Sequence, residues 1–383
     1  MTTLRLGRLG LGLALSLGLG CASLTTRTAA PPDDRVAPAG VVHVRWRVEL
    51  HAHQLFEARP EECAVGVVAG GRLVIGSRAG SMVGVSTANG HIDWATAATG
   101  GIDSEARLDP DHGQVYMGAD DGSFYAIEPT TGRIRWTYRA KGAIDERAEL
   151  GGDTVYLASS ADQVIALDAR TGKWRWQYDR ETPDGFTIHG YGGPRLHGSQ
   201  LLAGFADGFL VALQISNGEV AWAHGLAGTS EQFVDVDSTP VLDGETVLAA
   251  SYSGGVYALD LKDGSTRWRA PIEGVGPLSL IDGRIYFASP RSGLHALAKQ
   301  DGQILWRQGL PDAGDMTAPQ AVGRFLVFSG SRGGLFVVEP ASGRLLEVFN
   351  PGNGVCAGGT YDPATQRFYL LSNGGTLYAL DID

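Results

Sequence analysis

The stretch that decides the fold is DGSFYAIEPTTGRIRW, residues 121–136. An apolar run follows Gly122, a Thr-Gly pair comes next, and a second run ends in Trp136, which is the pattern of a β-hairpin. Nearly the same hairpin recurs as DQVIALDARTGKWRW, DGFLVALQISNGEVAW, GGVYALDLKDGSTRW and SGLHALAKQDGQILW. The chain is therefore built from a repeated unit.

The tryptophans that end these hairpins set the period of the repeat. Trp94, Trp136, Trp176, Trp222, Trp268 and Trp306 are 38 to 46 residues apart, and two more strand-like runs lie between each of them and the next hairpin. A period of about 40–45 residues with four short strands per unit predicts the blade of a β-propeller. One blade cannot bury both faces of its sheet, so the tryptophans are expected to pack between neighbouring blades. The Thr-Gly, Asn-Gly and Asp-Gly pairs supply the positive φ of the turns.

Counting the third strands of the units gives eight blades. These strands are expected at residues 81–85, 123–127, 163–167, 209–213, 256–259, 294–297, 335–338 and 376–380. The seventh unit has Glu347 at the tryptophan position, the eighth ends the chain without a fourth strand, and residues 43–48 form a Trp-bearing strand with no hairpin before it. We therefore predict an all-β, eight-bladed propeller over residues 41–383. Its blades are four-stranded and antiparallel, and the N-terminal strand completes the last blade, which leaves no open edge at the seam.

The composition fits this class of fold and argues against some partners. Of the 383 residues, 43% are hydrophobic and 55 are glycine, which is typical of a turn-rich all-β protein. The formal net charge of −11 argues against nucleic acid, whose phosphate backbone binds basic surfaces. It also provides no basic stripe for anionic lipids.

The first 40 residues differ from the rest of the chain. Arg5 and Arg8 precede the apolar run LGLGLALSLGLG, which predicts an export signal over residues 1–20. The stretch LGLGCAS resembles a bacterial lipobox, whose cysteine, here Cys21, is lipidated. Gly18 departs from the usual aliphatic residue, and cleavage by the ordinary signal peptidase would instead leave a soluble periplasmic protein. Residues 21–40 are rich in Ala, Thr and Pro and are expected to form a flexible linker, so that only the lipid contacts the membrane.

The two remaining cysteines occupy equivalent positions in two blades. Aligning the first strands of the units places Cys63 in the first blade and Cys356 in the eighth. These blades are neighbours across the closure of the ring, and an exported protein folds in an oxidising compartment. We predict a Cys63–Cys356 disulfide that pins the seam, with two buried free thiols as the alternative.

No sequence motif predicts a catalytic, cofactor or metal site. The chain has no nucleophile elbow, phosphate-binding loop or zinc ligand pair, and His51-x-His53 lacks an evident third ligand. Acidic residues gather near the starts of the innermost strands, where they would share one rim of the central channel: Asp103, Glu105, Asp145, Glu146, Asp235, Asp237 and Asp315. They are interpreted either as solvated loop residues or as a docking surface for a basic partner.

The hairpins resemble the quinoprotein propeller repeat, whose alcohol dehydrogenases hold pyrroloquinoline quinone (PQQ) in the channel and carry an adjacent-cysteine disulfide and a calcium site. This chain has no Cys-Cys pair. A closer resemblance is to the BamB family, the lipoprotein subunit of the outer-membrane β-barrel assembly machine. It covers essentially the whole chain and is sharpest over residues 233–268, FVDVDSTPVLDGETVLAASYSGGVYALDLKDGSTRW. The tryptophan-less seventh blade, SGRLLEV, is also similar.

The resemblance implies which residues bind a partner. In that family two neighbouring loops bind the periplasmic domains of the barrel-inserting subunit. The first loop carries a hydrophobic-x-hydrophobic-Arg-Gly pattern, which reads FTIHG here, with Phe186, Ile188 and His189 on those positions. His189 departs from the pattern, because a neutral imidazole lacks the charge and the donor fork of arginine. The second loop is DVD, so that Asp235 and Asp237 match. Phe186 and Ile188 are either exposed anchors for a partner or pack against a neighbouring blade.

The function that the resemblance implies is that of a non-catalytic scaffold, lipid-anchored on the periplasmic face of the outer membrane, which supports the insertion of outer-membrane proteins. Its partners would be the barrel-inserting subunit and other lipoproteins of the assembly complex, and direct binding of unfolded outer-membrane proteins stays open. Two other functions also stay open: a periplasmic, quinoprotein-like PQQ-dependent oxidoreductase, and a propeller scaffold of another envelope complex, since a fold does not fix a function.

Overall fold

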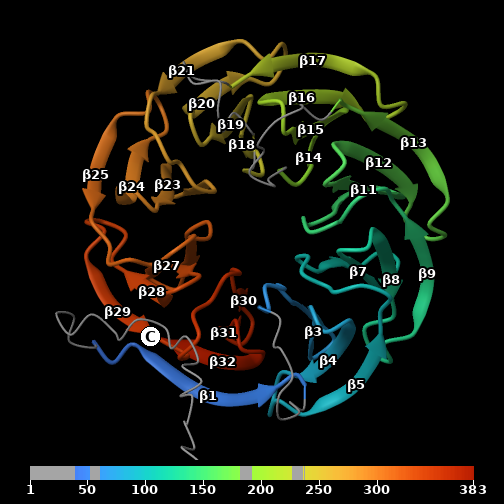
Figure 1. The fold of residues 1–383 in the computed structure, drawn as a ribbon. Helices are drawn as coiled ribbons and strands as arrows, with labels where there is room; N and C mark the ends of the chain where they lie inside the picture. Colours follow the sequence, from blue (N-terminus) through green and yellow to red (C-terminus); the bar gives the residue numbers. More distant parts are fainter. Residues whose placement is uncertain (1–38, 52–60, 182–191, 227–235, 237) are drawn as a thin grey trace, which may run out of the picture.

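Eight four-stranded antiparallel sheets stand side by side in a ring (Figure 1). The computed structural model describes residues 39–51, 61–181, 192–226, 236 and 238–383. Every regular element in these ranges is a β-strand. The predicted all-β, eight-bladed propeller is therefore confirmed.

The four strands of each blade run from the axis of the ring to its outer rim. The innermost strands are the shortest: β2 (Val67–Ala69), β6 (Arg107–Asp109), β10 (Glu149–Gly151), β14 (Arg195–His197), β18 (Val241–Asp243), β22 (Ser279–Ile281), β26 (Gln320–Val322) and β30 (Thr360–Asp362). The second strands are β3 (Arg72–Ser77), β7 (Gln114–Gly118), β11 (Thr154–Ser159), β15 (Gln200–Gly204), β19 (Thr246–Ser251), β23 (Arg284–Ser289), β27 (Phe325–Gly330) and β31 (Arg367–Leu371). The third strands are β4 (Ser81–Ser86), β8 (Ser123–Ile127), β12 (Gln163–Asp168), β16 (Phe209–Gln214), β20 (Gly255–Asp260), β24 (Gly293–Ala298), β28 (Gly334–Val338) and β32 (Thr376–Ile382). The outermost strands are β1 (Val42–Glu49), β5 (Ile92–Ala97), β9 (Ile134–Arg139), β13 (Trp174–Asp179), β17 (Val220–Gly225), β21 (Thr266–Ala270), β25 (Ile304–Gln308) and β29 (Leu345–Phe349).

We number the blades along the chain, so that blade 1 begins with β2 and blade 8 with β30. The N-terminal strand β1 pairs with β32 from Val42 opposite Ile382 to Glu49 opposite Thr376, which gives blade 8 the order β1-β32-β31-β30. The predicted closure of the ring by the N-terminal strand is thereby confirmed. Because successive strands in a blade are antiparallel, the connections between blades lie on the same side of the ring as the turns between second and third strands. We call this side the connection face.

The repeated tryptophans pack between blades, as predicted. One tryptophan in each of seven outermost strands covers the turn glycine of the next blade, and a Cβ at that glycine would lie only 2.3 to 2.7 Å from the indole. Trp174, the second tryptophan of β13, is instead 58% exposed. The seven pairs are Trp46–Gly90, Trp94–Gly132, Trp136–Gly172, Trp176–Gly218, Trp222–Gly264, Trp268–Gly302 and Trp306–Gly343. The glycines have φ between +70° and +77°, so both the turn conformation and the close approach of the ring require glycine. In six of the pairs the indole N–H also donates to a main-chain carbonyl of that turn.

Glu347 replaces tryptophan in blade 7 because the next blade has no such turn. The outer two strands of blade 8 come from opposite ends of the chain, so no turn glycine joins them. The Glu347 carboxylate instead accepts a hydrogen bond of 2.7 Å from the Val41 N–H, at the entrance to the closing strand. Both residues are buried, and the carboxylate thus satisfies a main-chain donor that would otherwise be unpaired.

The hydrophobic core is divided among the gaps between blades. Eight clusters of buried side chains each draw residues from two neighbouring blades, including the pair that meets at the seam. Each blade is therefore stabilised mainly by its two neighbours, as expected for a repeat ring.

Candidate partner-binding site

The residues expected to bind a partner fall, in sequence, within two connections between blades. They are Phe186, Ile188 and His189, between β13 and β14, and Asp235 and Asp237, between β17 and β18. All five, like Cys21, lie outside the described residues. The described residues on either side show where each connection leaves the ring and where it returns. We call these connections segment 182–191 and segment 227–237, the latter including the described residue Val236.

The two segments return to the ring at points that are hydrogen-bonded to each other. The Gly192 N–H donates to the Val236 carbonyl at 3.1 Å, and the Gly193 N–H donates to Thr239 Oγ1 at 3.0 Å. Val236 is fully buried in the core between blades 4 and 5. A Cβ at Gly192 would lie 2.6 Å from the Ser238 carbonyl oxygen, so this close approach requires glycine.

The two segments also leave the ring beside a common turn, that between β15 and β16 of blade 4. Before segment 182–191, the Arg180 guanidinium pairs with Asp207 of this turn and lies 4.5 Å from the centre of the Phe209 ring. Burial would lower the pKa of Arg180, but the hydrogen bond to Asp207 raises it above its usual value. Before segment 227–237, the Leu226 N–H donates to the Gly208 carbonyl at 2.8 Å. The ends of both segments are therefore fixed around blade 4.

A third connection joins this region. Thr239, which accepts the Gly193 N–H, donates in turn to Glu146 Oε2 at 3.4 Å. Glu146 lies between β9 and β10, in the connection that enters blade 3. Glu146 is one of the acidic residues noted in the sequence, and its contact with Thr239 places it at the rim beside the two segments.

Two of the other rim acids that the structure describes pair with arginines. Asp103 pairs with Arg78 at 2.7 Å, and Glu105 pairs with Arg147 at 3.1 Å. Burial raises the pKa of Asp103 to about 6. The positive charge of Arg78 acts in the opposite direction and lowers this pKa, whereas the negative charge of Asp145 raises it further. The sequence interpretation counted the acids of this rim without the arginines that face them. Each arginine belongs to a different blade from the acid that it faces, so the pairing does not show in the sequence.

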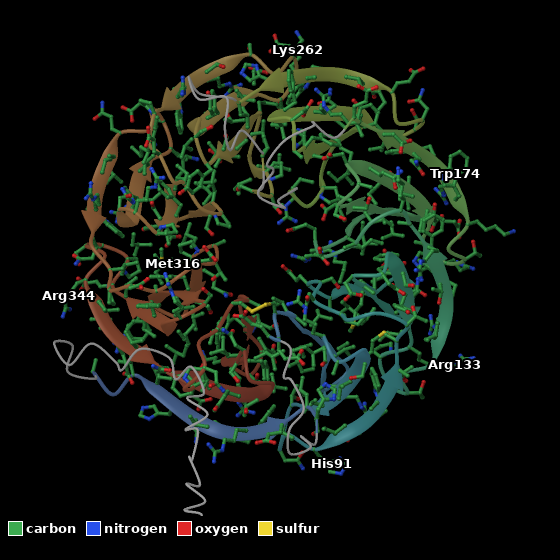
Figure 2. All side chains as sticks on the ribbon, in the orientation of Figure 1. His91, Arg133, Trp174, Lys262, Met316 and Arg344 are labelled. Carbon is green, nitrogen blue, oxygen red and sulfur yellow. A yellow bond between two sulfur atoms is a disulfide. The ribbon has the colours of Figure 1, made fainter. Side chains whose placement is uncertain are left out.

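The seam carries a disulfide on the connection face. Cys63 and Cys356 are bonded, with 5.4 Å between their Cα atoms and 293 residues between them in sequence. They lie in the connections that lead into β2 and β30, the innermost strands of blades 1 and 8. Figure 2 shows the yellow sulfur–sulfur bond near the axis of the ring. Beside it the Glu62 N–H donates to the Asn373 carbonyl at 3.2 Å, so a main-chain hydrogen bond also joins blades 1 and 8.

No group of three or more His, Cys, Asp or Glu side chains among the described residues is arranged to hold a metal ion. Of the two histidines considered as ligands, His51 is hydrogen-bonded to Ser77 Oγ, and His53 lies outside the described residues.

One protein-family model matches most of the residues of the ring. The model described as outer membrane protein assembly factor BamB matches residues 43–142 and 105–308, which together exceed half of the chain. The chain belongs to the BamB family. The resemblance seen in the repeats is thus confirmed at the level of the family.

Individual relatives agree with this assignment over parts of the chain. BamB of Legionella pneumophila (strain Paris) is 27% identical over 189 residues, 48% of each chain. The quinoprotein alcohol dehydrogenase PedH of Pseudomonas putida is 36% identical over 93 residues, 23% of this chain and 15% of PedH. This chain spans about half the length of the first BamB relatives that it matches. The crystal structure of BamB from Moraxella catarrhalis has a TM-score of 0.76 and 22% identity, covering 89% of this chain and 100% of that one, and shares the fold.

Within the described ranges, no helix has the length and apolar character needed to span a bilayer.

Proposed function

We propose that the protein is a non-catalytic scaffold of the outer-membrane β-barrel assembly complex, which supports the insertion of outer-membrane proteins. Segments 182–191 and 227–237 would bind the periplasmic domains of the barrel-inserting subunit. Residues 1–20 would direct export, lipidated Cys21 would anchor the protein to the periplasmic face of the outer membrane, and residues 21–40 would link the anchor to the ring over 41–383. The BamB relatives, named as outer membrane protein assembly factors, support the process.

The observation that carries this proposal is the joint anchoring of the two segments. They leave beside one turn, and they return at Gly192 and Val236, which share a hydrogen bond of 3.1 Å. A partner that contacts both segments at once meets attachment points whose relative position is already fixed. Fixed attachment points lower the entropy cost of binding, which favours a specific interface.

The test replaces the predicted anchors in the full-length, tagged protein. We expect Phe186→Ala with Ile188→Ala to reduce recovery of the barrel-inserting subunit from envelopes solubilised in a gentle detergent. Loss of one interface hot spot costs about 2 kcal/mol, or roughly 30-fold in affinity. Asp235→Asn with Asp237→Asn tests the second segment in the same assay.

A matched control removes apolar surface elsewhere on the ring. Ile304 and Leu305 of β25 in blade 6 are 52% and 49% exposed, and their double alanine variant should bind the subunit as the wild type does. Equal recovery with the Phe186/Ile188 variant and the wild type would refute the role of segment 182–191. Equal losses in the segment variant and the blade 6 variant would show a general effect of removing surface apolar groups.

The lipid anchor has its own test. The mass of the intact mature protein from native envelopes should correspond to a chain that begins at Cys21 and carries acyl groups, and Cys21→Ala should release it from the membrane fraction. A mature N-terminus without lipid mass would end the anchor part of the proposal and leave the binding part standing.

The PedH match favours a second candidate, a PQQ-dependent oxidoreductase, because its 36% identity over 93 residues is higher than that of the BamB relatives. Adding PQQ and calcium to the purified protein would then produce a change in visible absorbance and alcohol oxidation. An unchanged spectrum would remove this candidate.

A further inference from the structure

Charged residues are concentrated on one part of the inner wall of the ring. The first position of the innermost strand is occupied by Arg107 in blade 2, Glu149 in blade 3 and Arg195 in blade 4. The other five blades carry uncharged residues at this position: Val67, Val241, Ser279, Gln320 and Thr360. Two residues earlier, blades 2 and 3 add Glu105 and Arg147. The repeat itself does not require these charges, since five blades form without them.

The five charged side chains of blades 2 to 4 contact one another across the gaps between blades. Arg195 Nη1 lies 3.6 Å and Arg107 Nη2 lies 3.9 Å from the same oxygen of Glu149. Arg147 Nη1 lies 3.1 Å from Glu105 Oε1. Three guanidinium groups therefore face two carboxylates, which leaves an excess of one positive charge in the cluster.

The three arginines carry more N–H donors than the two glutamates can accept. Within the described part of the chain the buried Nε atoms of Arg107 and Arg147 have no hydrogen-bond acceptor. The other Glu149 oxygen accepts the Leu196 N–H at 3.4 Å. Burial, followed by the nearby charge of Arg147, lowers the pKa of Arg107. Buried N–H groups without acceptors and like charges held together both cost free energy, and a bound anion would offset both.

We propose that the inner wall of blades 2 to 4 is a binding site for a carboxylate group, held between Arg107, Arg147 and Arg195. A carboxylate carries the one negative charge that balances the cluster, and its two oxygens match the donor fork of a guanidinium. The side chains of these arginines are 25%, 32% and 33% exposed, so a ligand in the channel reaches them. The carboxylate comes either from an acidic side chain of a bound protein or from a small free acid.

The carboxylate site lies beside the attachment points of segments 182–191 and 227–237, but it does not depend on the function proposed for those segments. Arg195 follows Gly192 by three residues, and Arg147 follows Glu146, the acceptor of Thr239. A protein bound to segments 182–191 and 227–237 would therefore have the site within reach of an acidic side chain. The binding measurement below uses the purified protein alone, so its failure would leave the proposed scaffold function untouched.

The experiment is calorimetric titration of the purified full-length protein at constant ionic strength with two carboxylate probes. One is succinate, and the other is an amide-capped Gly-Glu-Gly-Glu-Gly peptide, whose Gln counterpart serves as the neutral control. We expect binding of at least one carboxylate probe and of neither the Gln peptide nor dimethyl succinate. Peptide binding without succinate binding assigns the site to a protein side chain, and the reverse result assigns it to a free acid.

Arginine variants connect the binding to this cluster. Arg107→Gln and Arg195→Gln should each weaken binding about tenfold or more, because a charged hydrogen bond is lost. Arg107→Lys keeps the charge, is the safer variant for folding, and should give an intermediate affinity. Arg133→Gln, which makes the same change in net charge at a side chain 72% exposed in an outer turn of blade 2, should leave binding unchanged. Absence of binding by both carboxylate probes, equal affinity for sulfate and succinate, or wild-type affinity in the Arg107 and Arg195 variants would overturn the proposal.

Discussion

Removing the seam disulfide should destabilise the ring without opening it. We consider Cys63→Ser with Cys356→Ser in a Cys21→Ser background, compared with the Cys21→Ser parent. A cross-link acts mainly on the unfolded chain, whose entropy it limits. For the 293-residue separation of this pair, the chain-entropy relation gives about 19 cal/mol/K, or about 5.7 kcal/mol at 25 °C, while the loss of a native disulfide typically costs about 2–5 kcal/mol. The folded ring should persist, because β1 still pairs with β32 along its length.

The free energy converts into a melting temperature through the size of the protein. An unfolding entropy of about 2.1 cal/mol/K per residue over the roughly 340 residues from 41 to 383 means that a loss of 3–5 kcal/mol lowers Tm by about 4–7 °C. Thermal melting followed by circular dichroism would measure this shift. Reduction of the parent should reproduce it, which separates the cross-link from the serine side chains. If the reduced parent and the double variant both melt within about 1 °C of the oxidised parent, the disulfide does not restrain the unfolded chain as argued.

Three further predictions concern single residues. Glu347→Ala leaves the N–H at the start of the closing strand without its buried acceptor, and should destabilise the protein by about 1–3 kcal/mol in denaturant unfolding, whereas Glu347→Gln should retain most of the stability. Gly132→Ala places a methyl group 2.3 Å from the indole of the preceding blade. Gly113→Ala is the matched control, because Gly113 has a similar positive φ but nothing within 4 Å of the added methyl group. Overpacking should make the Gly132 variant less stable than the Gly113 variant by about 1–3 kcal/mol. Because the pKa of Asp103 is raised to about 6 from an ordinary 3.8, the folded state binds the proton more tightly than the unfolded state, and stability should fall as pH rises from about 4 to about 6. Asp103→Asn should flatten that part of the stability profile, and an unchanged slope would place the raised pKa elsewhere.

The ring could be predicted from sequence because its signals are local and repeated. Every hairpin contains its own turn glycine and tryptophan, so each blade can be recognised without reference to the others. The predicted third strands differ from β4, β8, β12 and their equivalents by at most two residues at either end. The equivalence of Cys63 and Cys356 was also visible, because aligned repeats reveal which positions face each other across a seam.

The charged inner wall could not be predicted in the same way. The arginine and glutamate pairs join strands of different blades, so the partners lie far apart in sequence, as Arg107 and Glu149 do. The innermost strands are only three residues long, too short for an alternating pattern to mark which side chains face a neighbour. The sequence therefore showed acids near the rim but not the arginines that pair with them.

Departures from a repeat are informative when the fold does not explain them. Glu347 and the Cys63–Cys356 disulfide both depart from the repeat at the seam, and the two chain ends that meet there account for both. Arg107, Glu149 and Arg195 lie in blades that do not form the seam, and the first position of the other five innermost strands is uncharged. Unsatisfied buried donors cost stability, and the ring has no structural need for them at this position. Such residues are best explained by a ligand, which is why the inner wall of blades 2 to 4, and not the seam, is the second place to look for a binding partner.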